Sequence, residues 1–363
     1  MNHHEEPHIV DHKTRQTRIA PVEVVCVGEA LWDFYAPEGI PLEQAKLLRR
    51  VPGGGAVNTA TALARLGVPS GLCAALGDDA MGRGLRDEVA AAGIDVGRLA
   101  LGAARTGLML VAIERGEARF VGYRQGELEA RALAAALPAR WQARVVHFTG
   151  IAPVRGAIGA LVRAAAAARR EGCAVSVDIN ARPRMWPRAG RSALPGGAGA
   201  RPGINPGAGA RPGINPGAGA RPGINPGAGA RPGINPGATR GAGVRGCFRL
   251  FGQADLVKCS TGDLEVLGTT APALRKHLRA EATLVVTDGA RETLVLGPGG
   301  ERAVAPRPVR PLDPTGAGDA FCAGMLATLV WQGRDRWTDA ALMLRAVARG
   351  HDVARAWVRR KRG

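Results

Sequence analysis

The stretch Asp313-Pro-Thr-Gly-Ala-Gly-Asp-Ala-Phe321 combines a backbone that can approach a ligand closely with a carboxylate beside it. Gly316, Ala317 and Gly318 have little or no side chain, and an apolar run at helical spacing follows them. We therefore expect this loop to open a helix, whose first N–H groups and positive dipole end would bind phosphate. Asp319 could then accept a proton from an attacking hydroxyl, as phosphoryl transfer to an alcohol requires.

A glycine-rich loop with an acidic residue has a simpler alternative role, in which the carboxylate only complements the helix dipole. A second motif favours the chemical interpretation. Pro52-Gly-Gly-Gly-Ala-Val-Asn58 precedes an apolar-periodic helix, Thr59 to Leu66, that stops at Gly67. The two motifs, in this order and far apart, resemble those of the PfkB carbohydrate kinase family, also called ribokinase-like.

The resemblance runs from about Val22 to about Leu344 and implies a fold. It implies a doubly wound, three-layer α/β/α architecture with a mainly parallel sheet and a small β lid, built from residues 31–50 and 105–125. The kinase domain would span 21–363, after a disordered tail at 1–20. Gly28-Glu-Ala-Leu-Trp-Asp33 and Asp178-Ile-Asn-Ala-Arg182 look most like the fructokinase and 2-keto-3-deoxygluconate kinase members.

The resemblance also implies roles for individual residues. Asp319 would be the general base, and Gly316, Ala317 and Gly318 would hold the developing charge. Asp33, Gly54 and Asn58 would orient the sugar. Arg124 and Arg182 are candidates to pair with a carboxylate or phosphate on the substrate, or are simply solvent-exposed arginines. The residues implied on the ATP side are Asn180, Ser260, Asp263, Thr287 and Gly289.

Metal ions are implied with less detail. Asp263 would contact Mg²⁺ through water, although members of the family usually have glutamate at this position. Asp313 and Thr315 would bind a monovalent cation such as K⁺. The expected cofactors are thus ATP, Mg²⁺ and K⁺, and the expected partners are a small sugar and a second copy of the chain, joined through the lid.

Composition argues against other classes of protein. The net charge is +18, but only five of the 49 basic residues are lysines, and the arginines are scattered without interleaved aromatic residues. This pattern indicates a compositional bias rather than a nucleic-acid partner. No apolar run of about 18 residues predicts a membrane span, and the N-terminal stretch is polar, so we expect a cytoplasmic protein. The six cysteines lack CxxC spacing and are expected to be buried, reduced thiols.

Residues 201–240 contain four copies of a ten-residue unit rich in glycine and proline, such as Arg201-Pro-Gly-Ile-Asn-Pro-Gly-Ala-Gly-Ala210. The prolines preclude helix, and one isoleucine per unit cannot form a core. We therefore expect a disordered insertion at 190–246. Because loop-closure entropy grows slowly with length, such an insertion is thermodynamically tolerable.

Alternating apolar segments predict the order of the secondary structure. Strands are expected at Val22–Val27, Gly71–Leu76, Val145–Phe148, Ala174–Asp178, Asp255–Val257 and Leu284–Thr287. Helices are expected at Asn58–Leu66, Met81–Ala92, Ile158–Arg170, Gly316–Val330 and Thr338–Ala348.

These patterns predict an ATP-dependent sugar kinase that transfers the γ-phosphate to a primary hydroxyl of fructose, ketodeoxygluconate or a similar sugar. The alternative is a kinase-fold protein that binds sugar or nucleotide with little turnover. The insertion supports this alternative, and so does the C-terminal segment, where the alanine-rich adenine-side helix of the family is not recognisable after Arg345.

Overall fold

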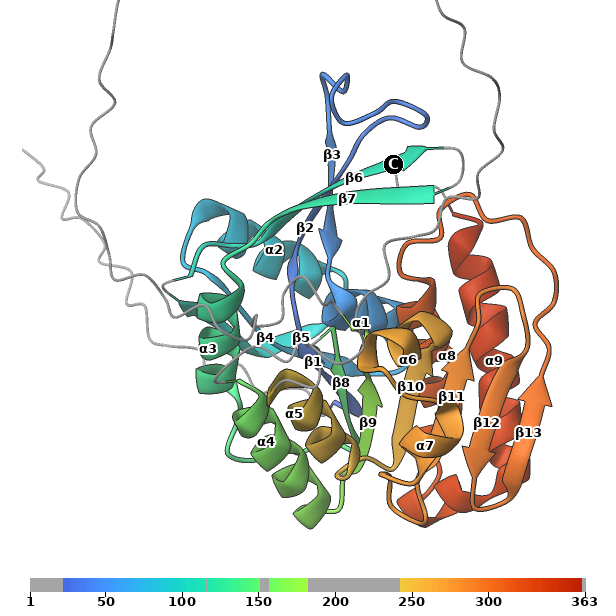
Figure 1. The fold of residues 1–363 in the computed structure, drawn as a ribbon. Coiled ribbons are helices and arrows are strands. Elements are labelled where there is room, and N and C mark those ends of the chain that lie inside the picture. Colours follow the sequence, from blue (N-terminus) through green and yellow to red (C-terminus); the bar gives the residue numbers. More distant parts are fainter. Residues whose placement is uncertain (1–21, 103, 115–116, 151–156, 182–241, 361–363) are drawn as a thin grey trace, which may run out of the picture.

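A computed structural model describes residues 22–102, 104–114, 117–150, 157–181 and 242–360. Within these residues, a nine-stranded sheet has the order β13-β12-β11-β10-β9-β8-β1-β4-β5 (Figure 1). The strands from β11 to β5 in this order run parallel, and β12 and β13 are antiparallel additions at one edge. A second, four-stranded sheet has the order β3-β2-β6-β7.

The strands of the large sheet are β1 (Val24–Gly28), β4 (Ser70–Gly77), β5 (Asp95–Gly102), β8 (Val145–Thr149), β9 (Ala174–Asp178), β10 (Leu256–Ser260), β11 (Thr283–Thr287), β12 (Thr293–Gly297) and β13 (Gly300–Val304). Those of the small sheet are β2 (Leu31–Tyr35), β3 (Arg49–Gly53), β6 (Leu108–Glu114) and β7 (Glu117–Tyr123). The helices are α1 (Gly55–Arg65), α2 (Ala80–Ala91), α3 (Gly126–Ala136), α4 (Ile158–Arg170), α5 (Ala242–Phe251), α6 (Thr261–Leu267), α7 (Ala271–Arg275), α8 (Ala317–Leu329), the 3₁₀ turn η2 (Arg334–Thr338) and α9 (Ala340–Val358).

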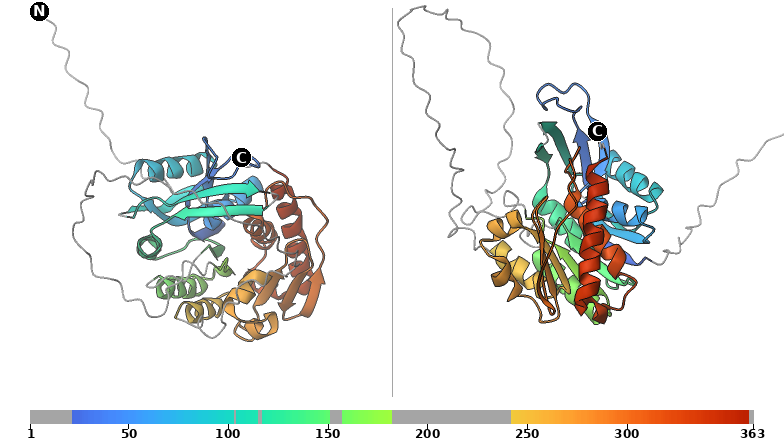
Figure 2. Two further views of the ribbon diagram at one scale, coloured as in Figure 1. Left: turned by 45° about the horizontal axis from the view of Figure 1, so that its top comes forward. Right: turned by 90° about the vertical axis from the view of Figure 1, so that its right-hand side faces the viewer.

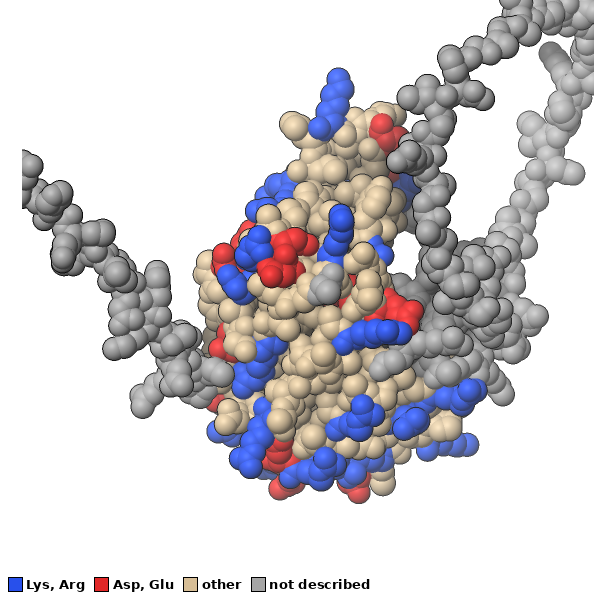
Figure 3. Space-filling view, turned by 90° about the vertical axis from the view of Figure 1, so that its left-hand side faces the viewer, with Lys and Arg blue, Asp and Glu red and all other residues tan. Residues whose placement is uncertain are grey.

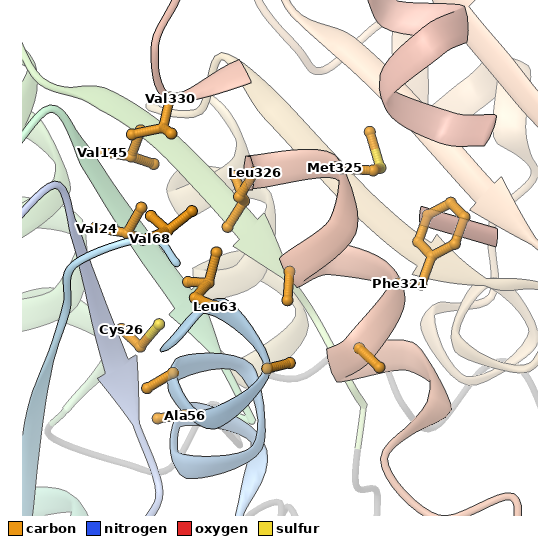
Figure 4. Close-up of a cluster of buried hydrophobic side chains, with 14 of the residues drawn as sticks. Val24, Cys26, Ala56, Leu63, Val68, Val145, Phe321, Met325, Leu326 and Val330 are labelled. Atoms are coloured by element: carbon orange, nitrogen blue, oxygen red, sulfur yellow. The ribbon is translucent and has the colours of Figure 1, made fainter. Parts of the chain in front are cut away.

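Strand β1 shows why the sheet is covered on both faces. Val24 and Cys26 belong to one buried cluster, together with residues of α1, α2, α8 and α9. Val25 and Val27 point the other way, into a second cluster with α3 to α7. Because side chains alternate along a strand, a continuous apolar run is buried on both faces. Figure 4 shows side chains of β1, α1 and α8 packed together in the first cluster. The predicted three-layer fold is confirmed.

The small sheet lies above the carboxyl end of β1, at the ends of the strands of the large sheet rather than beside an outer strand (Figures 1 and 2). Its strands fall within the two segments predicted to form the lid, 31–50 and 105–125, apart from the last residues of β3. Leu31–Tyr35 pairs with both Arg49–Gly53 and β6, so the first lid segment is joined to the second by backbone hydrogen bonds.

Two expectations need correction. Helix α9 runs to Val358, well beyond the predicted end at Ala348, because Gly350 continues the helix rather than ending it. A side chain at Gly350 would lie 2.9 Å from Phe321 of α8, and one at Gly324 would lie 2.8 Å from Gly350 Cα. These glycines let α8 and α9 pack closely. The predicted insertion, 190–246, also extends too far, because α5 already begins at Ala242. Residues 1–21 and 182–241 lie outside the described part of the chain.

The described residues contain no helix that is long and apolar enough to cross a membrane. All six cysteines are buried and free, as expected. On the face shown in Figure 3, lysine and arginine side chains are spread between uncharged and acidic ones rather than gathered in one stripe.

Candidate active site

The connectivity of the sheet marks one place where a ligand would bind. Strand β1 lies between β8 and β4, and the chain proceeds from β1 to β4 and β5 on one side and from β8 to β11 on the other. The carboxyl ends of β1 and β8 therefore flank a topological switch point, where open α/β sheets bind their ligands. They lie very close together, because a side chain at Gly28 would come within 2.0 Å of the Thr149 carbonyl oxygen.

The two glycine motifs meet at this switch point. Asn58, in the first turns of α1, donates a hydrogen bond of 2.9 Å from Nδ2 to Oδ2 of Asp319, in the first turn of α8. The two residues are 261 positions apart in the chain, and both are buried. Gly55 completes the contact: a side chain there would lie 3.3 Å from Asp319 Oδ1 and 3.0 Å from Thr149 Oγ1. The site thus joins two helix N-termini, whose dipoles favour a negatively charged ligand.

Both loops owe their shape to glycine. Gly54 caps α1 at φ 96° and Gly316 caps α8 at φ 74°, in a region of backbone conformation that other residues rarely adopt. Helix α8 begins at Ala317, so the prediction that the Gly-Ala-Gly loop opens a helix is confirmed. The first amides of such a helix lack intrahelical acceptors.

A buried ion pair lies behind the start of α8. Lys258 Nζ is 3.2 Å from both carboxylate oxygens of Asp178, and Cys322 Sγ lies 3.5 Å from Asp178 Oδ2. A side chain at Gly318 would come within 2.9 Å of Lys258 Nζ. Burial would lower the pKa of Lys258, but Asp178, Cys322, Asp263 and Asp319 together outweigh burial and raise that pKa above its usual value. The lysine therefore remains a cation.

The residues expected on the ATP side lie at the carboxyl ends of β9, β10 and β11. Asn180 has φ 40°, an uncommon conformation for a residue other than glycine. Thr287 ends β11, where its hydroxyl donates to the Cys259 carbonyl oxygen at 3.3 Å, and Gly289 follows two residues later with φ 59°. The sheet thus brings these predicted residues to the carboxyl ends of its strands, where the switch point also lies.

Asp263, which is predicted to contact Mg²⁺ only through water, has both carboxylate oxygens bonded to the protein. Its Oδ1 accepts from the Ala181 amide at 2.7 Å, and its Oδ2 accepts from both the amide and the hydroxyl of Ser260 at 2.7 Å. Ser260 Oγ in turn accepts from the Asp263 amide, which makes a capping box at the start of α6. These bonds hold the β10–α6 turn against Ala181. The carboxylate is committed to the protein and does not fit direct coordination of Mg²⁺.

Asp313 and Thr315 fit a cation better. Asp313 is 2% exposed, and its Oδ1 accepts from the Thr315 amide at 2.8 Å. Asp313 Oδ2 and Thr315 Oγ1 are buried and find no hydrogen-bond partner among the residues that the structure describes. Oxygen donors of this kind suit hard cations. The last turn of α9 supports the loop, because Trp357 Nε1 donates to the Thr315 carbonyl oxygen at 3.0 Å.

The predicted sugar-binding residues lie at the base of the small sheet. Asp33 on β2 is 6% exposed, and its carboxylate occupies the space that a side chain at Gly53 would need, at 2.2 Å. Arg124, directly after β7, is paired with Glu29 and Glu129 rather than exposed to solvent. Arg182 lies outside the described residues.

Sequence patterns did not single out Thr149. Its hydroxyl is fully buried and has no hydrogen-bond partner within the described residues, yet it lies beside Gly55 and therefore near Asp319. A threonine at the end of an apolar strand is ordinary in a sequence. Only the sheet order, which places β8 next to β1, could have drawn attention to it.

Comparison with known proteins agrees with this geometry. The model of the pfkB family of carbohydrate kinases matches residues 22–197 and 242–362. Fructokinase-1 of Oryza sativa is 35% identical over 173 residues, and 2-dehydro-3-deoxygluconokinase of Bacillus subtilis is 29% identical over 173 residues. These alignments cover 45% and 46% of this chain, and 53% of each relative, so the chain spans about half the length of the curated relatives it matches.

Solved structures match over nearly the whole chain. A PfkB protein from Polaromonas sp. is 25% identical with a TM-score of 0.67, and the match covers 93% of this chain and 96% of that one. A Vibrio cholerae fructokinase, solved with fructose, ADP and calcium ion, is 23% identical with a TM-score of 0.70 and 94% coverage of both chains. The likeness to the second structure shows the shared fold. Because the family model matches most of its length, the chain belongs to the pfkB family of carbohydrate kinases.

Proposed function

We propose that this protein is an ATP-dependent sugar kinase in which Asp319 is the general base. One observation carries the proposal: a buried carboxylate lies at the N-terminus of α8, at the switch point of the sheet, held by Asn58 from the N-terminus of α1. The first turn of α8 thus supplies both a carboxylate that can accept a proton and amides that can stabilise phosphate charge.

The reaction follows from this arrangement. A primary hydroxyl of the sugar gives its proton to the Asp319 carboxylate while its oxygen forms a bond to the γ-phosphorus. The bond between that phosphorus and the β–γ bridging oxygen breaks, and ADP leaves. The amides from Gly316 to Asp319 lie at the positive end of α8, where they would stabilise the charge on the transferred group. Correct positioning and charge stabilisation carry most of the catalysis of phosphoryl transfer.

The nucleotide would lie along the carboxyl ends of β9, β10 and β11, next to Asn180, Thr287 and Gly289. Magnesium would reach this place with the phosphates, because it usually keeps several waters and is bound largely through phosphate oxygens. Any contact with Asp263 would pass through water. A monovalent cation at Asp313 and Thr315 would use the unpaired oxygens of both side chains.

We propose a six-carbon ketose or keto sugar acid as the acceptor. This rests on the Leu31-Trp-Asp33 and Asp178-to-Arg182 patterns, and the relatives named fructokinase and 2-dehydro-3-deoxygluconokinase are consistent with it. An adenosine pocket would need aromatic stacking, whereas Phe120 and Tyr123 of β7 are 52% and 62% exposed. A second copy of the chain could pack on this exposed face of the lid.

A coupled assay of ADP release tests the proposal with fructose, ribose, 2-keto-3-deoxygluconate and adenosine as acceptors. We expect ADP release that depends on a ketose or keto sugar acid. Faster turnover of adenosine than of all three others would contradict the acceptor class. If thermal-shift measurements show stabilisation by sugar and ATP but no acceptor releases ADP, the binding protein with little turnover is the correct interpretation.

A further inference from the structure

Arg124 directly follows β7 of the small sheet, and two carboxylates hold it. Its Nη1 donates to Glu29 Oε2 at 2.7 Å, and its Nε donates to Glu129 Oε2 at 2.8 Å, with Nη2 bonded to the same oxygen. All three side chains are largely buried, with 12%, 18% and 15% exposed for Arg124, Glu29 and Glu129. Burial would lower the pKa of Arg124, but Glu29 and Glu129 together raise it, so the guanidinium stays charged.

This trio is continuous with the catalytic centre. Glu29 directly follows β1, and a side chain at Gly150 would lie 3.0 Å from Glu29 Cγ. Gly150 in turn adjoins Gly55, which contacts Asp319, since a side chain at Gly55 would lie 3.4 Å from Gly150 Cα and 3.3 Å from Asp319 Oδ1. The Glu29 carbonyl oxygen also lies against Gly54. A sugar bound between Asp319 and the lid would therefore meet this trio.

The charges of the trio do not cancel. Two carboxylates and one guanidinium leave one negative charge in a low-dielectric environment, and the buried Asp33 on β2 is a further acidic group of the sugar side. Glu129 is further fixed by the Gln125 amide, which donates to its Oε1 at 2.8 Å. An arginine held in this way cannot turn to a substrate carboxylate without breaking buried, charge-assisted bonds.

We propose that Glu29 and Glu129 make the sugar site select a neutral ketose over a keto sugar acid, with Glu129 as the specificity-determining residue. This rests on the proposed function and narrows its acceptor class. A substrate carboxylate would face the net negative charge of this trio, which disfavours binding by like-charge repulsion. A neutral sugar would instead find carboxylate oxygens that accept hydrogen bonds from its hydroxyl groups.

The first test uses the unmodified protein. We expect kcat/KM for fructose to exceed that for 2-keto-3-deoxygluconate by roughly tenfold or more, the scale of one unfavourable charge contact. A preference for the sugar acid would overturn the inference while leaving the kinase assignment intact. Absence of turnover with either sugar would instead contradict the proposed function, and in that case competition of each sugar for binding, measured by calorimetry, decides the selectivity.

The second test is Glu129→Gln, which removes one charge and keeps the shape of the side chain. We expect the ratio of kcat/KM for sugar acid to fructose to rise by roughly tenfold, because the trio becomes neutral. Glu127→Gln is the matched control: Glu127 lies on the same helix, is 57% exposed and pairs with Arg131. An equal change in both variants, or none in Glu129→Gln, would overturn the role of Glu129.

Discussion

Two buried aspartates lie at the start of α8, and the partners that hold them differ in charge. Asp319 accepts a hydrogen bond from a neutral amide, that of Asn58. Asp178 contacts a lysine ammonium through both of its oxygens. The amide orients the Asp319 carboxylate without neutralising its charge, whereas Asp178 and Lys258 form a direct, buried ion pair. The comparison supports the proposal that Asp319 is the general base, with Asp178 holding the structure.

Asp319 and Asp178 also differ in the residues that pack against them. Asp319 packs closely against Gly55, where a side chain would lie 3.3 Å from Asp319 Oδ1. Asp178 instead faces Lys258 and Cys322, side chains that bury it. The ion pair thus packs against α8 at Gly318 and Cys322, whereas Asp319 is bonded to Asn58 of α1.

The largest effect on activity should come from Asp319→Asn. The variant keeps the hydrogen-bonding shape but cannot accept a proton, so turnover should fall roughly 10²–10⁴-fold, the range for a general base. ATP binding, measured by calorimetry, should be retained. Full activity with the preferred sugar would show that the two aspartates have been given the wrong roles.

The largest effect on stability should come from Lys258→Met, which leaves the Asp178 carboxylate buried and unpaired. We expect a loss of about 3–5 kcal/mol in the free energy of unfolding, measured in urea. Adding Asp178→Asn should recover part of this loss, because the uncompensated charge is gone. Lys276→Met, at an exposed lysine, is the control and should change stability little. A double variant no more stable than Lys258→Met would contradict the ion-pair account.

A smaller loss is expected from Gly318→Ala. The new methyl group would come within 2.9 Å of Lys258 Nζ, which is fixed by its ion pair, so stability should fall by about 1–3 kcal/mol. Gly84→Ala is a matched control in the interior of α2, where a side chain meets nothing within 4 Å. That variant should be stabilised by about 0.4–1 kcal/mol. Equal effects of the two changes would show that Lys258 does not restrict Gly318.

Local sequence patterns predicted part of the fold and part of the candidate site. Apolar runs predicted the strands around β1 and β8, and the two glycine motifs predicted Asp319 and Asn58 as site residues. The direct bond between them, across 261 positions, follows from the sheet order and not from any spacing. The hydroxyl of Thr149 and the pairing of Arg124 with Glu29 and Glu129 were missed for the same reason, since each depends on elements that meet only in the folded chain.

Glycine caused the error at α9. Gly350 reads as a helix end, because glycine commonly follows the last turn. Its reason is instead a close contact with α8, where Phe321 leaves no room for a side chain. The capping box of Ser260 and Asp263 and the bond from the Ala181 amide were also not predicted from sequence, because Ala181 and Asp263 meet only in the folded chain.

The smallest effect should come from excision of residues 201–240, the four glycine- and proline-rich units. With one isoleucine per ten-residue unit, this segment cannot contribute to a hydrophobic core. The melting temperature should therefore change by no more than about a few degrees, and sugar affinity should be kept. Loss of soluble expression on excision would show that the repeat is structural.

The most direct measurement of the role of Asp319 compares two acceptors. One is the preferred sugar, and the other carries fluorine next to its reactive carbon, which makes the reacting hydroxyl more acidic. A more acidic hydroxyl needs less help from a base, so the ratio of wild-type to Asp319→Asn turnover should be clearly smaller for the fluorinated sugar. The same ratio for both sugars would contradict the account, because Asp319 would then position the substrate without accepting its proton.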